Sequence, residues 1–323
     1  MAEPGGINST NQTSHCTGLS PTKYVEIGTY SVLLLLSLTG NTLIVAVFFR
    51  RKVPRTTVNR FIVNMAFADL IIPVILLPAM ITERHLERAW LVDGVIGTAL
   101  CKLYWLASSL STAVSIVSMV VIATERFHAI LFAMKPPLIS RKLACKIIAL
   151  TWVFAVVFRS NYLYAASLMI YYNNRYCMLS NPAVKTSLIA QLCLFAISGF
   201  LLMVFYISII TTLFRNKTAC SDLAEAVKQR EKENRRVTCM LVVVVVVFYS
   251  VWTPNLVNSI LYVIYPRFGF KQPCYFQWLT EVTLPVLHTV ITPVVYYIFN
   301  NKYRKAFKEL LCCLKEANKW AQV

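Results

Sequence analysis

The sequence predicts an all-α membrane protein, a bundle of seven transmembrane helices followed by a short amphipathic eighth helix. Three observations support this fold class. Of the 323 residues, 57% are hydrophobic and only 14% are charged, with a mean hydropathy of +0.60, whereas a soluble domain carries about 25% charged residues. Seven apolar stretches are each long enough to cross a bilayer, which takes about 20 residues. The basic residues also gather in alternate connecting segments, as they do in membrane proteins.

The composition excludes several other classes. Disorder requires low hydrophobicity, and ten cysteines in 323 residues are too few for a small disulfide scaffold. A water-soluble nucleic-acid binder explains the net charge of +18 but not the apolar excess. We therefore expect the lipid bilayer, and no nucleic acid, as a partner.

The seven spans divide the chain into three parts. They are predicted at residues 25–49, 61–82, 98–123, 143–170, 187–214, 237–264 and 277–299. Residues 1–24 form a polar N-terminal tail, 25–299 the transmembrane domain, and 300–323 the eighth helix and tail. The spans lack the period-two alternation of a membrane β-barrel.

The basic residues predict the orientation. The segments after spans one, three, five and seven hold 22 of the 32 Lys and Arg residues. Because basic loops stay in the cytoplasm, these loops and the C-terminus are expected there, with the N-terminus outside. The tail also carries two N-glycosylation sequons, at Asn8 and Asn11.

Cysteines fall on both sides of the membrane. Those in or beside outer segments are Cys16, Cys101, Cys177 and Cys274, where disulfides persist. Four cysteines allow three pairings, and composition does not choose among them. Cys312 and Cys313 follow an amphipathic stretch, 301–311, where palmitoylation and free thiols are equally compatible with the sequence.

Polar side chains at bilayer depth are functional candidates because burying them is costly. Asn41, Asp69, Ser115, His288 and Thr292 lie at comparable depths in spans one, two, three and seven. They predict a chamber for a water or a small cation. For Asn41 and Ser115, ordinary hydrogen bonding between helices is an equal alternative. For the Asp69 carboxylate we favour an ion or proton site.

Short motifs fall in a fixed order on the spans. They are Gly40-Asn41, Ala68-Asp69-Leu70, Cys101, Glu125-Arg126-Phe127, Trp152, Cys177, Phe248 with Trp252-Thr253-Pro254, and Thr292-Pro293-Val294-Val295-Tyr296. Each motif alone is weak, but the ordered set resembles the rhodopsin-like G-protein-coupled receptors over about residues 25–313. The resemblance implies a plasma-membrane receptor that binds an extracellular ligand and activates heterotrimeric G proteins.

The resemblance also implies roles for single residues. Cys101 and Cys177 would form the extracellular disulfide, leaving Cys16 with Cys274 as a less certain second pair. Asp69 and Ser115 would form a sodium pocket, the sole cofactor expected. The remaining roles belong to an activation switch. In it, Glu125, Arg126 and Phe127 would meet the G protein, and Ile116, Phe248 and Trp252 would repack beneath the ligand. Pro254 and Pro293 would kink their helices, and Tyr206 and Tyr296 would hold the active state. Residues 301–311 would be the eighth helix, anchored by Cys312 or Cys313.

Several positions depart from the family pattern. Thr292 replaces an Asn and His288 occupies another sodium-linked position, which weakens the case for sodium and raises a pH-sensitive alternative. Asn234 replaces the acid that would lock Arg126, with Glu233 one residue away, so raised basal signalling is a hypothesis. Ser198 stands where span five usually has a proline that shapes the ligand pocket.

The expected ligand is a peptide. Span seven has no Lys for a retinal Schiff base, and Ser108 stands where aminergic receptors carry their Asp. The second outer loop predicts two β-prone arms, 168–172 and 175–179, around the turn-prone Asn173-Asn174. Such a hairpin lid, like the Glu-Arg-Phe triplet, is similar to those of neuropeptide receptors. A lipid or small-molecule receptor is the alternative, and an ion- or proton-coupled transporter is the alternative of another class.

Candidate ligand contacts are polar or aromatic residues in the outer halves of the spans. They are Lys102, Tyr104, Ser108, Arg159, Gln191, Trp252 and Glu281. Arg159 is the most informative, because a cation inside a span requires a partner. It pairs with an acidic ligand group or extends its charged head outward to water, and the sequence does not decide between these two. No nucleophile or metal motif indicates an enzyme.

Overall fold

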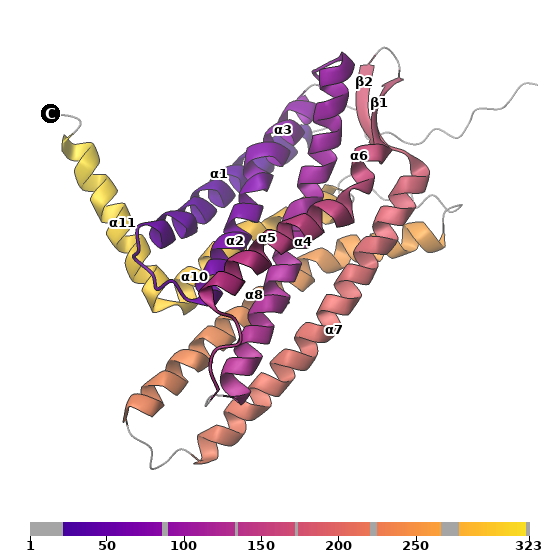
Figure 1. Cartoon of the computed structure of the whole chain (residues 1–323). Helices are drawn as coiled ribbons and strands as arrows, with labels where there is room; N and C mark the ends of the chain where they lie inside the picture. Colours follow the sequence, from indigo (N-terminus) through magenta and orange to yellow (C-terminus); the bar gives the residue numbers. More distant parts are fainter. Residues whose placement is uncertain are drawn as a thin grey trace, which may run out of the picture.

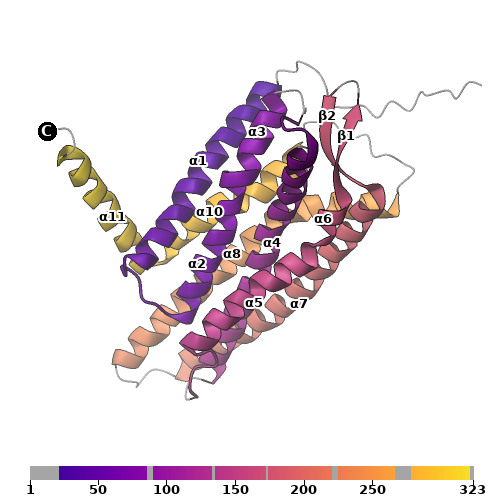
Figure 2. The same ribbon diagram turned by 45° about the horizontal axis from the view of Figure 1, so that its top comes forward.

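The computed structural model describes residues 22–85, 90–132, 135–171, 174–219, 225–265 and 278–320 (Figures 1 and 2). Its helices are α1 (Thr22–Phe49), α2 (Thr57–Ile71), α3 (Leu77–His85), α4 (Gly94–Leu131), α5 (Arg141–Arg159), α6 (Asn161–Ala165), α7 (Asn181–Ala219), α8 (Glu225–Ile264), α10 (Leu284–Phe299) and α11 (Asn301–Trp320). Two π-helical turns, η1 (Ile72–Leu76) and η2 (Leu279–Thr283), and two strands, β1 (Ala166–Tyr171) and β2 (Asn174–Leu179), complete the fold.

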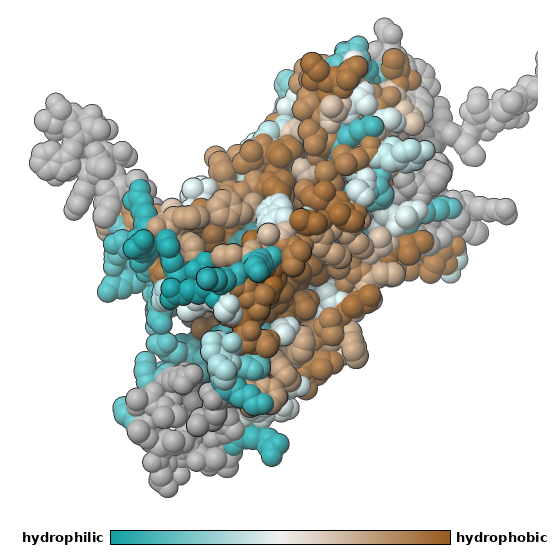
Figure 3. Space-filling model, in the orientation of Figure 1, coloured by the Kyte–Doolittle hydropathy of each residue, from teal (hydrophilic) through white to brown (hydrophobic). Residues whose placement is uncertain are grey.

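The predicted bundle of seven spans is confirmed. Six helical segments within the described chain are long and apolar enough to cross a membrane, and a shorter apolar helix, α10, is extended by η2 over residues 279–299. Hydrophobic residues cover much of the face of the bundle that Figure 3 shows. Exposed apolar side chains include Phe200 and Met203 on α7 and Val157 on α5. Such a surface is stable in lipid and would aggregate in water.

The fourth span ends earlier than the sequence predicted. The prediction carried it to residue 170, but α5 ends at Arg159, the short α6 follows, and residues 166–171 form strand β1. The apolar run 166–170 is compatible with either a strand or a helix end, because periodicity does not separate short apolar runs. Pairing with β2 decides it. The predicted hairpin is confirmed, but its predicted turn at Asn173-Asn174 is wrong, because Asn174 is the first residue of β2 and pairs with Tyr171.

Helices α7 and α8 extend beyond the bundle at the end opposite the hairpin (Figure 1). They have 39 and 40 residues, or about 60 Å at 1.5 Å per residue, twice the hydrocarbon thickness. The basic run before span six therefore continues that span as a helix. Helix α7 is continuous past Ser198, whose hydroxyl is 2.7 Å from the Tyr249 hydroxyl of α8.

Helix α4 lies at the centre of the bundle. It packs against α2, α5, α7 and the hairpin. The Asn64 amide of α2 donates to Ser118 of α4 (3.0 Å), and its oxygen accepts from the Trp152 indole of α5 (2.9 Å). The Asn64 side chain thus joins three helices. Separating them would leave its amide and its two partners without hydrogen bonds inside the membrane, which would cost free energy.

Helix α11 leaves the bundle at the end of α10 (Figure 2). It is longer than the predicted segment 301–311 and continues to Trp320. Glu309 accepts a hydrogen bond from Lys52 (2.9 Å), which holds the pKa of the Glu309 carboxyl below its usual range. Cys312 is exposed, as palmitoylation would require. The side chain of Cys313, and the residues Asn8, Asn11, Cys16 and Cys274, lie outside the described part.

The close approach of α1 to α10 at Gly40 suggests a stability test. A Cβ atom at Gly40 of α1 would stand 2.9 Å from both Cβ and Cγ of Pro293 in α10. We expect Gly40→Ala to push α1 from α10 and to lower the free energy of unfolding by about 1–3 kcal/mol. Gly28→Ala, in the same helix with open space around it, should leave stability unchanged or raise it slightly. Thermal unfolding of the solubilised protein measures both. Equal unfolding midpoints for the two variants would contradict the packing argument.

Candidate functional site

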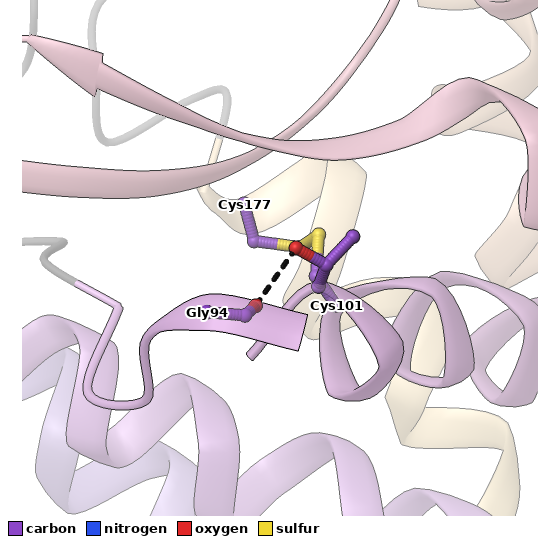
Figure 4. Close-up of a disulfide and its surroundings, with 4 residues drawn as sticks. Gly94, Cys101 and Cys177 are labelled. Carbon is purple, nitrogen blue, oxygen red and sulfur yellow. Dashed lines mark hydrogen bonds between the residues drawn. A yellow bond between two sulfur atoms is a disulfide. The ribbon is translucent and has the colours of Figure 1, made fainter. Parts of the chain in front are cut away.

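A disulfide fixes the β-hairpin to the bundle. Strands β1 and β2 pair antiparallel with Leu168 opposite Cys177, and Cys177 is bonded to Cys101 near the start of α4 (Figure 4). The bridge spans 76 residues, so it removes about 4–5 kcal/mol of chain entropy from the unfolded state. The Cys101–Cys177 pairing implied by the resemblance is confirmed. We call this end of the bundle the hairpin end.

Charged side chains line a groove beside the hairpin. The groove, about 580 Å³ in volume, lies between the start of α4 and β1–β2. Asp93 pairs with Arg175 of β2, and Lys102, a predicted ligand contact, also lines the groove. The Trp90 amide donates to the Arg175 carbonyl (2.6 Å). The hairpin end therefore presents both signs of charge around a rigid loop.

The next predicted residues lie on α4 below this groove. The Tyr104 ring packs edge-on against Trp90 (5.8 Å) and Trp105 (5.7 Å). The Ser108 hydroxyl donates to the Trp105 carbonyl (2.8 Å) within the same helix. Tyr104 thus belongs to an aromatic cluster at the hairpin end, whereas Ser108 already uses its donor internally.

Other predicted contacts come from α7 and α8. Gln191 is half-buried on α7. Trp252 lies on α8, and its indole N–H is buried without a hydrogen-bond acceptor in the described part of the chain. The side chain of Glu281 lies outside the described part. Lys102 thus lines the groove beside the hairpin, whereas Trp252 belongs to the aromatic part of the core.

Arg159 is a buried cation at the end of α5. It is 1% exposed, so the alternative in which its head extends outward to water is wrong. None of its three guanidinium nitrogens makes a hydrogen bond within the described residues, and no described carboxylate lies within ion-pair distance. The Phe158 ring is 5.1 Å away and Tyr162 is close enough to interact. An anion that reached this guanidinium would meet several free donors.

Asp69 is the buried acid at the middle of the bundle. It is 1% exposed. Its Oδ1 atom accepts hydrogen bonds from Ser111 and Ser115 of α4, both at 3.2 Å, and lies 3.5 Å from Nε2 of His288 on α10. No sequence motif marked Ser111, although it stands one helical turn before Ser115 and so faces the same way.

The two other residues of the predicted chamber donate hydrogen bonds to backbone carbonyls, and Asn41 Oδ1 is buried without a partner among the described residues. The Asn41 amide donates to the Ser37 carbonyl and to the Thr289 carbonyl, both at 2.9 Å. The Thr292 hydroxyl donates to the His288 carbonyl at 2.8 Å. Asn41 therefore joins α1 to α10, and Thr292 caps a carbonyl within its own helix.

An aromatic cluster continues from His288 toward the hairpin end. The His288 ring lies 5.1 Å from Phe248 and 6.2 Å from Trp252 between ring centroids. Phe195 of α7 packs on both rings, at 5.8 and 5.5 Å, and Ile116 is fully buried in the same core. The predicted switch residues of α4 and α8 thus share one core, to which α7 adds Phe195, a residue that no sequence motif marked.

The core continues to the opposite end of the bundle through two tyrosines. Tyr206 and Tyr296 are both buried in it. The Tyr296 ring stacks on Tyr303 of α11 at 5.9 Å. Tyr296 follows Pro293 in α10 and so lies where that helix meets α11.

Arg126 marks this opposite end, which we call the Arg126 end. Its guanidinium makes two hydrogen bonds to Glu125, at 2.6 and 2.8 Å, and Phe127 packs on Phe205 of α7 (5.3 Å). A cavity of about 300 Å³, lined by Arg126, Asn234 and residues of α10 and α11, opens beside it. Glu233 pairs with Lys302 of α11 (3.2 Å), so it belongs to a different ion pair from that of Arg126.

A family model identifies this arrangement. The model described as 7 transmembrane receptor (rhodopsin family) matches residues 40–296, which is well over half of the chain. The chain belongs to the rhodopsin family of seven-transmembrane receptors. The receptor resemblance stated from its motifs is thereby confirmed.

Individual relatives of the receptor are known by name. It is 26% identical to galanin receptor 2b of Danio rerio over 303 residues, which cover 92% of this chain and 77% of the relative. It is 28% identical to a QRFP-like peptide receptor of Branchiostoma floridae, covering 91% and 80%. It is 26% identical to neuropeptide FF receptor 1 of Rattus norvegicus, covering 90% and 70%.

The pair of Arg126 with Glu125 suggests a test of the receptor's resting state. Both side chains are largely buried, at 17% and 10% exposure, and a hydrogen bond to a charged group contributes about 1.5–3 kcal/mol. We expect Glu125→Gln to free the guanidinium and to raise ligand-independent nucleotide exchange on a G protein about 5-fold or more.

The exposed pair of Lys52 with Glu309 supplies the control. Glu309→Gln removes one carboxylate in the same way, but from a pair that is 42% and 38% exposed and contributes little. Its exchange rate should equal that of the unmodified receptor. A Glu125→Gln rate no higher than the Glu309→Gln rate would contradict a restraining role for Glu125.

Proposed function

We propose that the protein is a plasma-membrane receptor that binds an extracellular peptide at its hairpin end and activates heterotrimeric G proteins at its Arg126 end. Its N-terminus is extracellular and its C-terminus cytoplasmic. The observation that carries this proposal is one continuous buried core. It includes Phe248 and Ile116 beneath Trp252, and Met240, which lines the Arg126 cavity.

The core gives the receptor a physical route between its ends. Trp252 and Phe248 lie on α8, which also carries Glu233 at the Arg126 end. A ligand that shifts the Trp252 ring tilts α8 about Pro254, which already lacks one backbone hydrogen bond. The exposed Glu233–Lys302 pair resists this tilt only weakly. The tilt widens the cavity beside Arg126 and gives a G protein access to it.

A peptide fits the hairpin end better than a lipid or a small molecule. The rigid β1–β2 hairpin, fixed by Cys177, stands beside a groove with charges of both signs. Backbone and side-chain groups of a peptide match such a surface, whereas a lipid matches an apolar one. Three relatives are named as receptors for galanin, a QRFP-like peptide and neuropeptide FF.

The buried guanidinium of Arg159 narrows the ligand further. It is a cation without an anionic partner among the described residues, so an acidic group of the ligand is its expected complement. This group is a carboxylate of an acidic side chain or a free C-terminus. Lys102, at the groove, offers a second and more exposed cation.

A peptide panel tests the proposed function. Membranes of cells that express the chain are tested for nucleotide exchange on G proteins with peptides of the galanin and neuropeptide FF types, both amidated and with free C-termini. We expect at least one peptide to stimulate exchange, and Arg126→Ala, which leaves the hairpin end intact, to abolish the response. Stimulation by lipids or metabolites in place of peptides would overturn the ligand class.

Variants of Arg159 test the acidic group. For an active peptide, we expect Arg159→Gln to lower potency about 30-fold, because breaking a buried charge pair costs about 2 kcal/mol or more. Arg159→Lys should retain part of the potency, and Lys102→Gln should have the smaller effect of an exposed charge. A peptide in which the acidic group is amidated should be insensitive to Arg159→Gln. Equal potency of all peptides on the Arg159→Gln and unmodified receptors would contradict this role.

A further inference from the structure

The contact between Asp69 and His288 bears on the cation that the family resemblance implies at this position. The two side chains are 1% and 3% exposed. Among the described side chains, Asp69 is the single acidic group within 4.0 Å of the His288 ring, with 3.5 Å between Oδ1 and Nε2. The pair joins α2 to α10 in the middle of the bundle, far from either end.

The other ring nitrogen fixes the state of the imidazole. His288 Nδ1 is hydrogen-bonded to the backbone carbonyl of Pro285. A carbonyl oxygen accepts and does not donate, so Nδ1 carries a hydrogen. In a neutral ring of this tautomer, Nε2 bears a lone pair, which would face the Asp69 carboxylate in a buried site. That arrangement is repulsive, and a proton between Nε2 and Oδ1 makes it attractive.

With a proton between Nε2 and Oδ1, the net charge of the pair is zero. An ionised Asp69 beside an imidazolium has the same net charge, zero, as a protonated Asp69 beside a neutral imidazole. A bound sodium ion would neutralise a lone buried carboxylate, but here it would leave a buried charge of plus one, which is costly. The pair thus neutralises the Asp69 carboxylate without a sodium ion.

The available ligands lead to the same conclusion. Sodium is a hard cation that prefers several oxygen ligands. Asp69, Ser111 and Ser115 offer oxygens, because a hydroxyl that donates to Asp69 Oδ1 still has lone pairs for a cation. The Thr292 hydroxyl and the Asn41 amide group donate to backbone carbonyls of α10, and Asn41 Oδ1 is buried without a partner among the described residues. From α10, however, the group that faces Asp69 Oδ1 is a ring nitrogen of His288, 3.5 Å away, in place of an oxygen ligand. The residues present therefore do not fit a sodium ion.

We propose that His288 is the built-in counter-charge of Asp69 and that this receptor is consequently not regulated by sodium. The imidazole also packs against Phe248 and Trp252. The counter-charge is thus part of the rigid aromatic core, whereas a sodium ion would be free to leave. His288→Asn removes the charge and supplies an amide oxygen, so it creates the ligand set that sodium requires.

The test compares unfolding midpoints of the purified full-length receptor in sodium, potassium and N-methylglucamine chlorides, each at about 0.15 M. We expect the unmodified receptor to show the same midpoint in all three salts. We expect His288→Asn to be stabilised by sodium alone. At ten times its dissociation constant, sodium favours the folded state about 11-fold, which corresponds to a rise of about 2–4 °C.

Two control variants isolate the site. His85→Asn makes the same substitution at an exposed histidine of α3 and should gain no sodium response. Asp69→Asn combined with His288→Asn removes the carboxylate and should lose the response of His288→Asn. The thermal measurement needs neither ligand nor G protein, so its failure is distinguishable from failure of the proposed peptide function.

The outcomes separate clearly. A sodium-specific rise in the unmodified receptor overturns the proposal, whatever the variants do. A His288→Asn receptor that folds and ignores sodium also overturns it, because His288 would then not be what excludes the ion. If His288→Asn fails to fold, His288→Gln carries the same amide and replaces it, and the comparison of salts on the unmodified receptor remains decisive.

Discussion

The buried carboxylate of Asp69 is the constraint on which the rest of the bundle depends. A charge inside an apolar bundle is tolerated only where polar groups surround it. Here Ser111 and Ser115 on α4 donate hydrogen bonds to Asp69, and the His288 ring on α10 lies 3.5 Å away. Three helices must therefore turn one chosen face toward Asp69. Once those rotations are fixed, the apolar residues on the opposite faces meet lipid, which accounts for the hydrophobic outer surface.

The same rotations align the parts of the receptor that would transmit a signal. His288 touches Asp69 on one side and the rings of Phe248 and Trp252 on the other. The hairpin end is held rigidly, by a disulfide and a paired strand, whereas the Arg126 end is held by ion pairs, some of them exposed. Stiffness where a ligand binds and weak restraints where a helix must move are the arrangement that a ligand-driven switch requires, because an exposed pair costs little to break.

The sequence was sufficient for features that depend on composition and spacing. The seven spans follow from apolar length, and the hairpin arms from β-prone runs around a turn. Features that depend on one tertiary contact were not predictable. The end of span four was wrong because pairing with β2, not periodicity, decides residues 166–170. The burial of Arg159 could not be read from its position in a span. Asn41 and Thr292 have suitable side chains for a polar chamber, but the sequence does not show that their donor groups bond to backbone carbonyls of α10.

Two departures from the family pattern share one feature: in each, the charged partner is a side chain of the protein itself. Where the resemblance implies an ion from solution, the proposed counter-charge is His288 of the chain itself. Where it implies an acid from the sixth span that locks Arg126, the described ion pair of Arg126 is with the adjacent Glu125. A tethered partner differs from a dissolved ion in one respect, because its occupancy does not depend on concentration. It also differs from a partner on a moving helix, because Glu125 stays beside Arg126 when α8 tilts. The two partners lie within α4 and between α2 and α10, and the ring of His288 also packs on the aromatic core of Phe248 and Trp252.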